Sequence, residues 1–126
     1  MKITAQMLRG GGDHAKRACA EQIAIFEREW PNGVEVNEAN VLRAFAIGLD
    51  VGWFVETLLS LPSLVAFRQA EFLAQAAYRI ALASTPVAYN QYETPSWQAY
   101  ERDWAQALVA AIENEGQGAL AMPYLL

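Results

Sequence analysis

Two segments in the second half of the chain share the pattern that most constrains the fold. LPSLVAFRQAEF begins at Leu61 and TPSWQAYERDWA begins at Thr94, and the two match when one is shifted by 33 positions. Each has Pro at its second position, followed by apolar residues at steps of three or four. Pro in the first turn and this spacing are typical of amphipathic helices. The pattern predicts two long helices, over about 62–83 and 95–114, with a short helical turn near 86–93.

The first 61 residues predict four shorter helices. The second of these is expected to run up to Pro31, whose ring disfavours helical geometry in the residue before it, with Cys19 on the apolar face. The expected N-caps are Thr4, Asp13, Asn37 and Asp50. The predicted fold is therefore an all-α, single compact domain of six or seven helices. In it, an N-terminal four-helix module (1–61) packs on the two longer helices of the C-terminal part (62–126).

Composition supports a helical, folded chain. Apolar residues make up 54% and charged residues 18% of the sequence, which argues against global disorder. A single Cys excludes an intramolecular disulfide and fits a reducing compartment. No apolar run has the length expected of a signal peptide or of a membrane span. We therefore expect a cytoplasmic protein with no membrane partner.

The charge is unevenly distributed along the chain. Residues 1–33 carry five basic and four acidic side chains, a net of +1, whereas residues 34–126 carry four basic and ten acidic ones, a net of −6, which together give the formal charge of −5. A protein that binds nucleic acid directly normally presents a basic surface to the phosphates. The sequence therefore predicts no direct nucleic-acid contact and favours a protein partner, with a basic one easiest to accommodate.

One apolar stripe in the last predicted helix has two interpretations. Its members recur at steps of three or four: Trp97, Tyr100, Trp104, Leu108 and Ile112. Such a stripe usually packs against neighbouring helices, so a core face is the favoured interpretation. A binding groove is the alternative, because Trp and Tyr are concentrated at protein interfaces.

Candidate partner-binding residues lie in and around the same region. Tyr89, Tyr92 and Glu93 are expected in an exposed connection, where aromatic and amide side chains make adaptable contacts, although the tyrosines can instead cover a helix junction. Four acidic residues form a candidate surface for a basic partner, with a merely solvated face as the alternative: Glu101, Asp103, Glu113 and Glu115. The apolar ending AMPYLL is expected to dock onto the body of the protein or onto another chain.

No catalytic, cofactor-binding or metal-binding set is predicted. His14 and Cys19 are the only residues of their types, and a separation of five does not place them on one helical face. Glu27 and Glu29 lie about 200° apart around a helix and cannot act together. One His with scattered carboxylates has no metal-ligand spacing, and GGGD lacks the ending of a phosphate-binding loop. The sequence therefore predicts a protein that is not an enzyme.

The N-terminal block contains a series of short motifs: MKITAQML, then Cys19, Gln22 and Phe26, then WPNGVEV, ANVLRA and GLDVGW. This pattern resembles a module of small proteins encoded by phages and prophages of proteobacteria. In those proteins, repeats of the type Ala-Pro-Ala-Trp-x-Ala-Tyr-Glu often follow the module. TPSWQAYERDWAQALVAAI is similar to such a repeat. The segment GGGDHAKR ahead of Cys19 departs from the pattern, which places the first turn in doubt.

The resemblance implies a genomic setting and, through it, a class of function. Many small acidic phage proteins inhibit host defence stoichiometrically, anti-CRISPR proteins among them. We therefore expect an inhibitor that binds a Cas effector or nuclease as its protein partner. A phage structural or assembly component that self-associates is the alternative, and a helical transcriptional regulator is disfavoured by the charge. Whether the chain is a monomer or a homodimer stays open.

Overall fold

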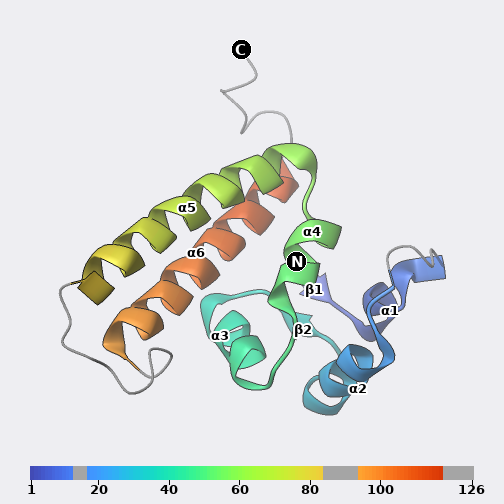
Figure 1. Cartoon of the computed structure of the whole chain (residues 1–126). Coiled ribbons are helices and arrows are strands. Elements are labelled where there is room, and N and C mark those ends of the chain that lie inside the picture. Colours follow the sequence, from blue (N-terminus) through green and yellow to red (C-terminus); the bar gives the residue numbers. More distant parts are fainter. Residues whose placement is uncertain (13–16, 84–93, 118–126) are drawn as a thin grey trace. The chain divides into compact units, whose positions relative to one another are not determined.

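The computed structural model describes residues 1–12, 17–83 and 94–117 (Figure 1). The chain divides into two compact units, Met1–Leu59 and Ser60–Leu126. Within the described residues there are six α-helices, one short 3₁₀ turn and a single pair of two-residue strands. The all-α fold class predicted from the sequence is confirmed. The expected helical turn near 86–93 lies outside the described residues.

The first unit contains the four shorter helices that the sequence predicts. They are α1 (Ala5–Leu8), α2 (Ala20–Glu29), α3 (Glu38–Ala46) and α4 (Val51–Leu58), with the 3₁₀ turn η1 at Gly10–Gly12. The N-caps of the last two are confirmed. The Asn37 side chain accepts a hydrogen bond from the Asn40 amide at 2.8 Å, and Asp50 accepts one from the Trp53 amide at 3.2 Å. Such caps satisfy backbone donors that a helix start leaves unpaired.

Two predictions for this unit were wrong in detail. Helix α2 begins at Ala20, and Cys19 occupies its N-cap position with extended backbone geometry. The Cys19 side chain is therefore exposed and is not part of the core. Thr4 stands at the N-cap of α1 but makes no side-chain capping bond. Asp13, the expected cap of the second helix, lies outside the described residues.

A short antiparallel sheet ties the N-terminus to the segment after α2. Strand β1 (Lys2–Ile3) pairs with β2 (Val34–Glu35), with Ile3 opposite Val34. Gly33, just before β2, has φ of 86°, and a Cβ there would lie 2.8 Å from the Ile3 carbonyl oxygen. Only glycine fits this conformation and this close approach without strain.

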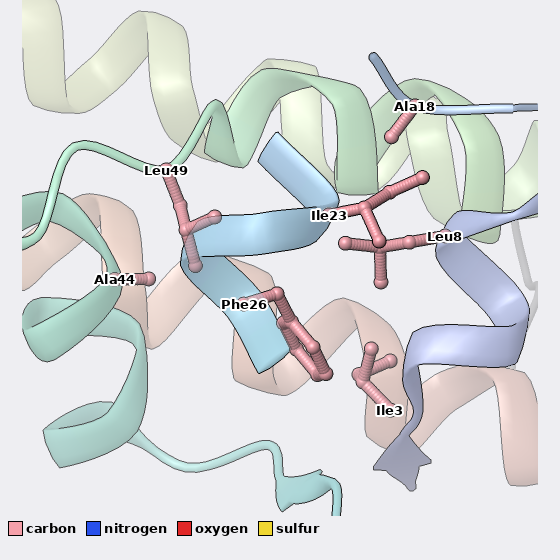
Figure 2. Packing of buried hydrophobic residues seen from close by; sticks show 7 residues of the cluster. All are labelled: Ile3, Leu8, Ala18, Ile23, Phe26, Ala44 and Leu49. Atoms are coloured by element: carbon pink, nitrogen blue, oxygen red, sulfur yellow. The ribbon is translucent and has the colours of Figure 1, made fainter. Parts of the chain in front are cut away.

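The core of the first unit is an apolar cluster that draws on β1, α1, α2, α3 and the adjoining turns. Figure 2 shows its side chains pointing into a common interior: Ile3, Leu8, Ala18, Ile23, Phe26, Ala44 and Leu49. Phe26 is central, with its ring 5.4 Å from that of Trp30 and 6.5 Å from that of Phe54. The Gln22 side chain adds a polar clamp, because it donates to the Gly48 carbonyl at 3.2 Å and accepts from the Asp50 amide at 2.7 Å.

The second unit is an antiparallel pair of long helices, α5 (Leu61–Ala83) and α6 (Pro95–Gln117), which lie side by side in Figure 1. The Thr94 hydroxyl accepts a hydrogen bond from the Trp97 amide at 3.1 Å, so Thr94 caps the start of α6. At the other end of the pair, the backbone amide of Ser60 donates to the Glu115 carboxylate. The Ser60–Glu115 contact joins the start of α5 to the end of α6.

Candidate protein-binding surface

The tryptophan stripe of α6 faces α5. Trp104, Leu108 and Ile112 are buried, and Trp97 and Tyr100 are half-buried. The Trp104 ring meets Phe67 of α5 edge to face, with centroids 4.9 Å apart. Edge-to-face pairs of this kind are a favourable aromatic geometry. The interpretation of the stripe as a core face is thus confirmed for its buried members.

Three aromatic rings close the other end of the α5–α6 pair. The Tyr78 ring of α5 lies 5.4 Å from Trp97 and 5.6 Å from Tyr100, and the two α6 rings are 5.1 Å apart. The Tyr78 hydroxyl is buried and has no hydrogen-bond partner among the described residues. The cluster fills the space between the helices and makes Trp97 and Tyr100 part of the packing of this unit.

A polar network at the middle of the pair orients Arg68, an exposed residue of α5. The Trp104 indole N–H donates to the Glu71 carboxylate at 2.8 Å, and the Arg68 guanidinium donates to the same carboxylate at 2.9 Å. The guanidinium also lies 5.7 Å from the centroid of the Phe67 ring. Glu71 therefore balances the charge of Arg68 within the chain and holds its side chain along the helix.

The candidate acidic residues do not form one patch. Asp103 and Glu113 are exposed, whereas Glu101 and Glu115 are half-exposed. On a helix, Glu101 and Asp103 point about 160° apart, while Glu101 and Glu115 share a side but are separated by about 21 Å along the axis. The Glu115 carboxylate is already engaged by the Ser60 amide. Tyr89, Tyr92 and Glu93 lie outside the described residues.

One exposed apolar surface was not predicted from the sequence. It is the outer face of α5, the side of this helix that faces away from α6. Five large apolar side chains on it are exposed: Leu61 (73% exposed), Val65 (40%), Phe72 (65%), Leu73 (69%) and Ile80 (70%). Most of them, together with Leu64, Arg68 and Gln69, line a shallow open groove of about 600 Å³. We call these residues and their groove the outer face of α5.

The 33-residue repeat contains a signal that would have revealed this face. Shifting α5 onto α6 places Val65 on Gln98, Leu73 on Gln106 and Ile80 on Glu113. The α6 residues are exposed, as expected for polar side chains on the outer side of a helical pair. Helix α5 is instead apolar on two sides, which is typical of a helix that is covered on both. At these three outer positions, α5 is thus apolar where α6 is polar.

Cys19 borders a small hollow of about 150 Å³ in the first unit, beside Gln22 and Asp50. Among the described residues, no three His, Cys, Asp or Glu side chains gather as a metal site would require. Within the same residues, no helix combines the length and the apolar character needed to cross a membrane.

Comparison with protein-family models, with curated proteins and with solved structures finds no match to this chain.

Proposed function

We propose that this chain is a phage-encoded inhibitor of bacterial defence that acts by stoichiometric protein binding, with the outer face of α5 as its contact surface. The observation that supports a binding role is the row of exposed apolar side chains on that face. Monomeric proteins rarely expose contiguous apolar patches larger than a few hundred Å², and the largest patch on a protein is often functional. An exposed row of this kind favours protein binding as the function of the helical pair.

Energetics supports the same proposal. Covering a large apolar side chain contributes roughly 1.5–3 kcal/mol relative to leaving it in water. Leu61, Phe72, Leu73 and Ile80 are each exposed by 65% or more, so a partner that covers them gains most of this contribution. Phe72 and Leu73 lie near the middle of the helix, where a well-packed anchor would exclude water most completely. We assign these two residues as the centre of the contact.

The partner class follows from the resemblance to phage proteins and from the overall charge of −5. A component of a CRISPR system, an effector or its nuclease, is the proposed target, and the chain would then be an anti-CRISPR protein that blocks it by occupancy. The acidic residues on the other surfaces of α6, Asp103 and Glu113 among them, would speed association with a basic target surface. The apolar face would supply most of the affinity.

Capture from lysate tests the proposal. Tagged protein is incubated with lysate of a bacterium that carries active CRISPR systems, and the bound proteins are identified by mass spectrometry. We expect one Cas protein or complex in near-stoichiometric amount, and we expect the protein to suppress CRISPR interference in cells. Recovery of the tagged protein alone, with interference intact, would contradict the proposed function.

A matched pair of variants tests the surface. Phe72→Glu places a charge at the centre of the outer face of α5, and Ala110→Glu places the same charge at an exposed position of α6. Neither residue is in the core, so both variants should fold. We expect Phe72→Glu to abolish capture and Ala110→Glu to retain it. Equal capture by the two variants would move the contact away from α5.

A further inference from the structure

The outer face of α5 has an internal symmetry. Large apolar residues stand toward both ends and at the middle: Leu61, Leu64 and Val65, then Phe72 and Leu73, then Ile80. Between the first group and the middle lie the longer polar side chains of Arg68 and Gln69. Between the middle and Ile80 lie the small residues Ala76 and Ala77. Long and small side chains thus occupy positions equidistant from the midpoint of Phe72 and Leu73.

An antiparallel copy of α5, related by a two-fold axis through this midpoint, places the residues of this face from Val65 to Ile80 opposite one another. Phe72 falls opposite Leu73 of the second copy, and Val65 falls opposite Ile80. Gln69 falls opposite Ala76, and both arginines of the helix, Arg68 and Arg79, fall opposite alanines. A two-fold contact requires such self-complementarity, because one patch must fit itself. Alternating long and small residues across a helix pair is also how such pairs interdigitate.

We propose that the outer face of α5 is the interface with a second copy of this chain, with the two α5 helices antiparallel and the axis between Phe72 and Leu73. Two α5–α6 pairs then form a four-helix assembly in which α5 is covered on both sides. This inference rests on the proposed function in one respect, that the face binds protein. It adds the identity of one partner, a second copy of the chain, which the target has to displace in order to bind.

The exposed area and the charge both suit a second copy. From the exposed fractions of its five large apolar residues, the face offers roughly 500–600 Å² per copy, so that a dimer covers about 1,000–1,200 Å², at the lower end for a specific interface. The chain is acidic, with a net charge of −5, yet the large side chains at the centre of this face carry no carboxylate. Glu71, at its edge, already pairs with Arg68 of the same chain. The centre of the contact therefore brings no like charges together.

Disulfide trapping tests the register. In a Cys19→Ser background, Val65→Cys and Ile80→Cys variants are prepared separately, mixed and oxidised mildly. The antiparallel register brings position 65 of one copy to position 80 of the other, so we expect a cross-linked dimer from the mixture and little from either variant alone. Ala110→Cys, on an exposed surface of α6, is the control and should not cross-link. Cross-linking of each variant to itself, as a parallel pair would give, would overturn the proposed register.

Sedimentation equilibrium tests the interface itself. We expect the chain, of 13.9 kDa, to sediment as a reversible dimer. Phe72→Glu with Leu73→Glu should raise the dimer dissociation constant by at least about a hundredfold, because each change occurs twice in a two-fold interface. Ala110→Glu should leave the constant unchanged. A monomeric mass at concentrations up to about 0.5 mM would overturn the inference, because a specific dimer with an interface of this size should associate more tightly than that.

The two proposals fail in distinguishable ways. A monomeric protein that captures a Cas component through Phe72 would overturn the dimer and leave the proposed function standing. A dimer that captures no defence component would overturn the proposed target and leave the interface standing. If both hold, purified target should convert the dimer to a one-to-one complex, and the apparent affinity for the target should fall as the concentration of the chain rises.

Discussion

Helix α5 offers a direct comparison between two phenylalanines of one helix that face opposite sides. Phe67 is 1% exposed and packs edge to face on Trp104, whereas Phe72 is 65% exposed on the outer face. Replacing each by Ala removes the same group of atoms and improves intrinsic helix propensity by the same amount. Any difference in stability between the two variants therefore measures burial and packing alone.

The structure predicts a large difference. Replacing a fully buried Phe by Ala costs about 3–5 kcal/mol, from lost transfer free energy and the cavity left behind, and the edge-to-face contact with Trp104 belongs to this loss. The Phe72 side chain is mostly exposed in the isolated chain, so Phe72→Ala should change the free energy of unfolding by no more than about 0.5 kcal/mol. Phe67→Ala should thus be the less stable variant by roughly 3 kcal/mol or more.

Urea unfolding followed by circular dichroism provides the assay, with low micromolar protein so that self-association contributes little. The measurement is then repeated at higher protein concentration. The cost of Phe72→Ala should grow with concentration, because a dimer is stabilised by mass action, while the cost of Phe67→Ala should be present at every concentration. Similar costs for the two variants at low concentration would refute the assignment of the two faces of α5.

Three further predictions concern the first unit. Asn37→Ala should lower the free energy of unfolding, measured by urea titration, by about 1 kcal/mol, because it removes the cap of α3. Asn37→Asp should retain most of the stability that the cap provides. Gly33→Ala should cost about 1–3 kcal/mol in the same assay, because φ is positive and the added Cβ meets the Ile3 carbonyl. The hydrogen bond from Arg43 holds the pKa of Glu29 below its usual value, so this pair stabilises the fold above the unfolded pKa and the contribution is lost as pH falls through the folded pKa. Thermal unfolding from about pH 6 to about pH 3 should therefore show a weaker acid dependence for Glu29→Gln than for the original chain.

Local signals allowed the helices to be predicted well. An Asn or Asp before a run of helical periodicity marks a helix start through a hydrogen bond between neighbours in sequence, so Asn37 and Asp50 were recognised as caps without knowledge of the fold. The sheet was missed because each strand has only two residues, too few to show alternation, and because its pairing joins positions more than 30 residues apart. Cys19 was misplaced because a periodic pattern was extended through residues 17–19, which are not helical.

The candidate site was harder to predict, for a physical reason. Periodicity shows which residues share a side of a helix, but burial depends on which side the neighbouring helix covers. For α6 the choice was simple, because one side is aromatic and the other polar. For α5 both sides are apolar, so the sequence alone does not tell the covered side from the exposed one. The contact of Phe67 with Trp104 shows that the Phe67 side of α5 is the covered one, and Phe72 is exposed.

The 33-residue repeat yields one more variant, which separates the needs of folding from those of binding. Val65→Gln, Leu73→Gln and Ile80→Glu together give α5 the residues that α6 carries at the equivalent outer positions. All three sites are exposed, and Gln and Glu are better helix formers than Val and Ile, so the isolated chain should retain its helical content and unfold within about 1 kcal/mol of the original.

The same triple variant should lose both the dimer and the captured target, as measured by sedimentation and affinity capture, because every change removes apolar area from the outer face. Loss of the fold instead would mean that the outer residues of α5 are needed within the chain itself, and the face would then be no binding surface. Retention of both interactions by a folded variant would place them on another part of the molecule. Folding without binding is the combination that the structure predicts, because Phe67, Glu71 and Tyr78, which contact α6, lie on the opposite side of the helix.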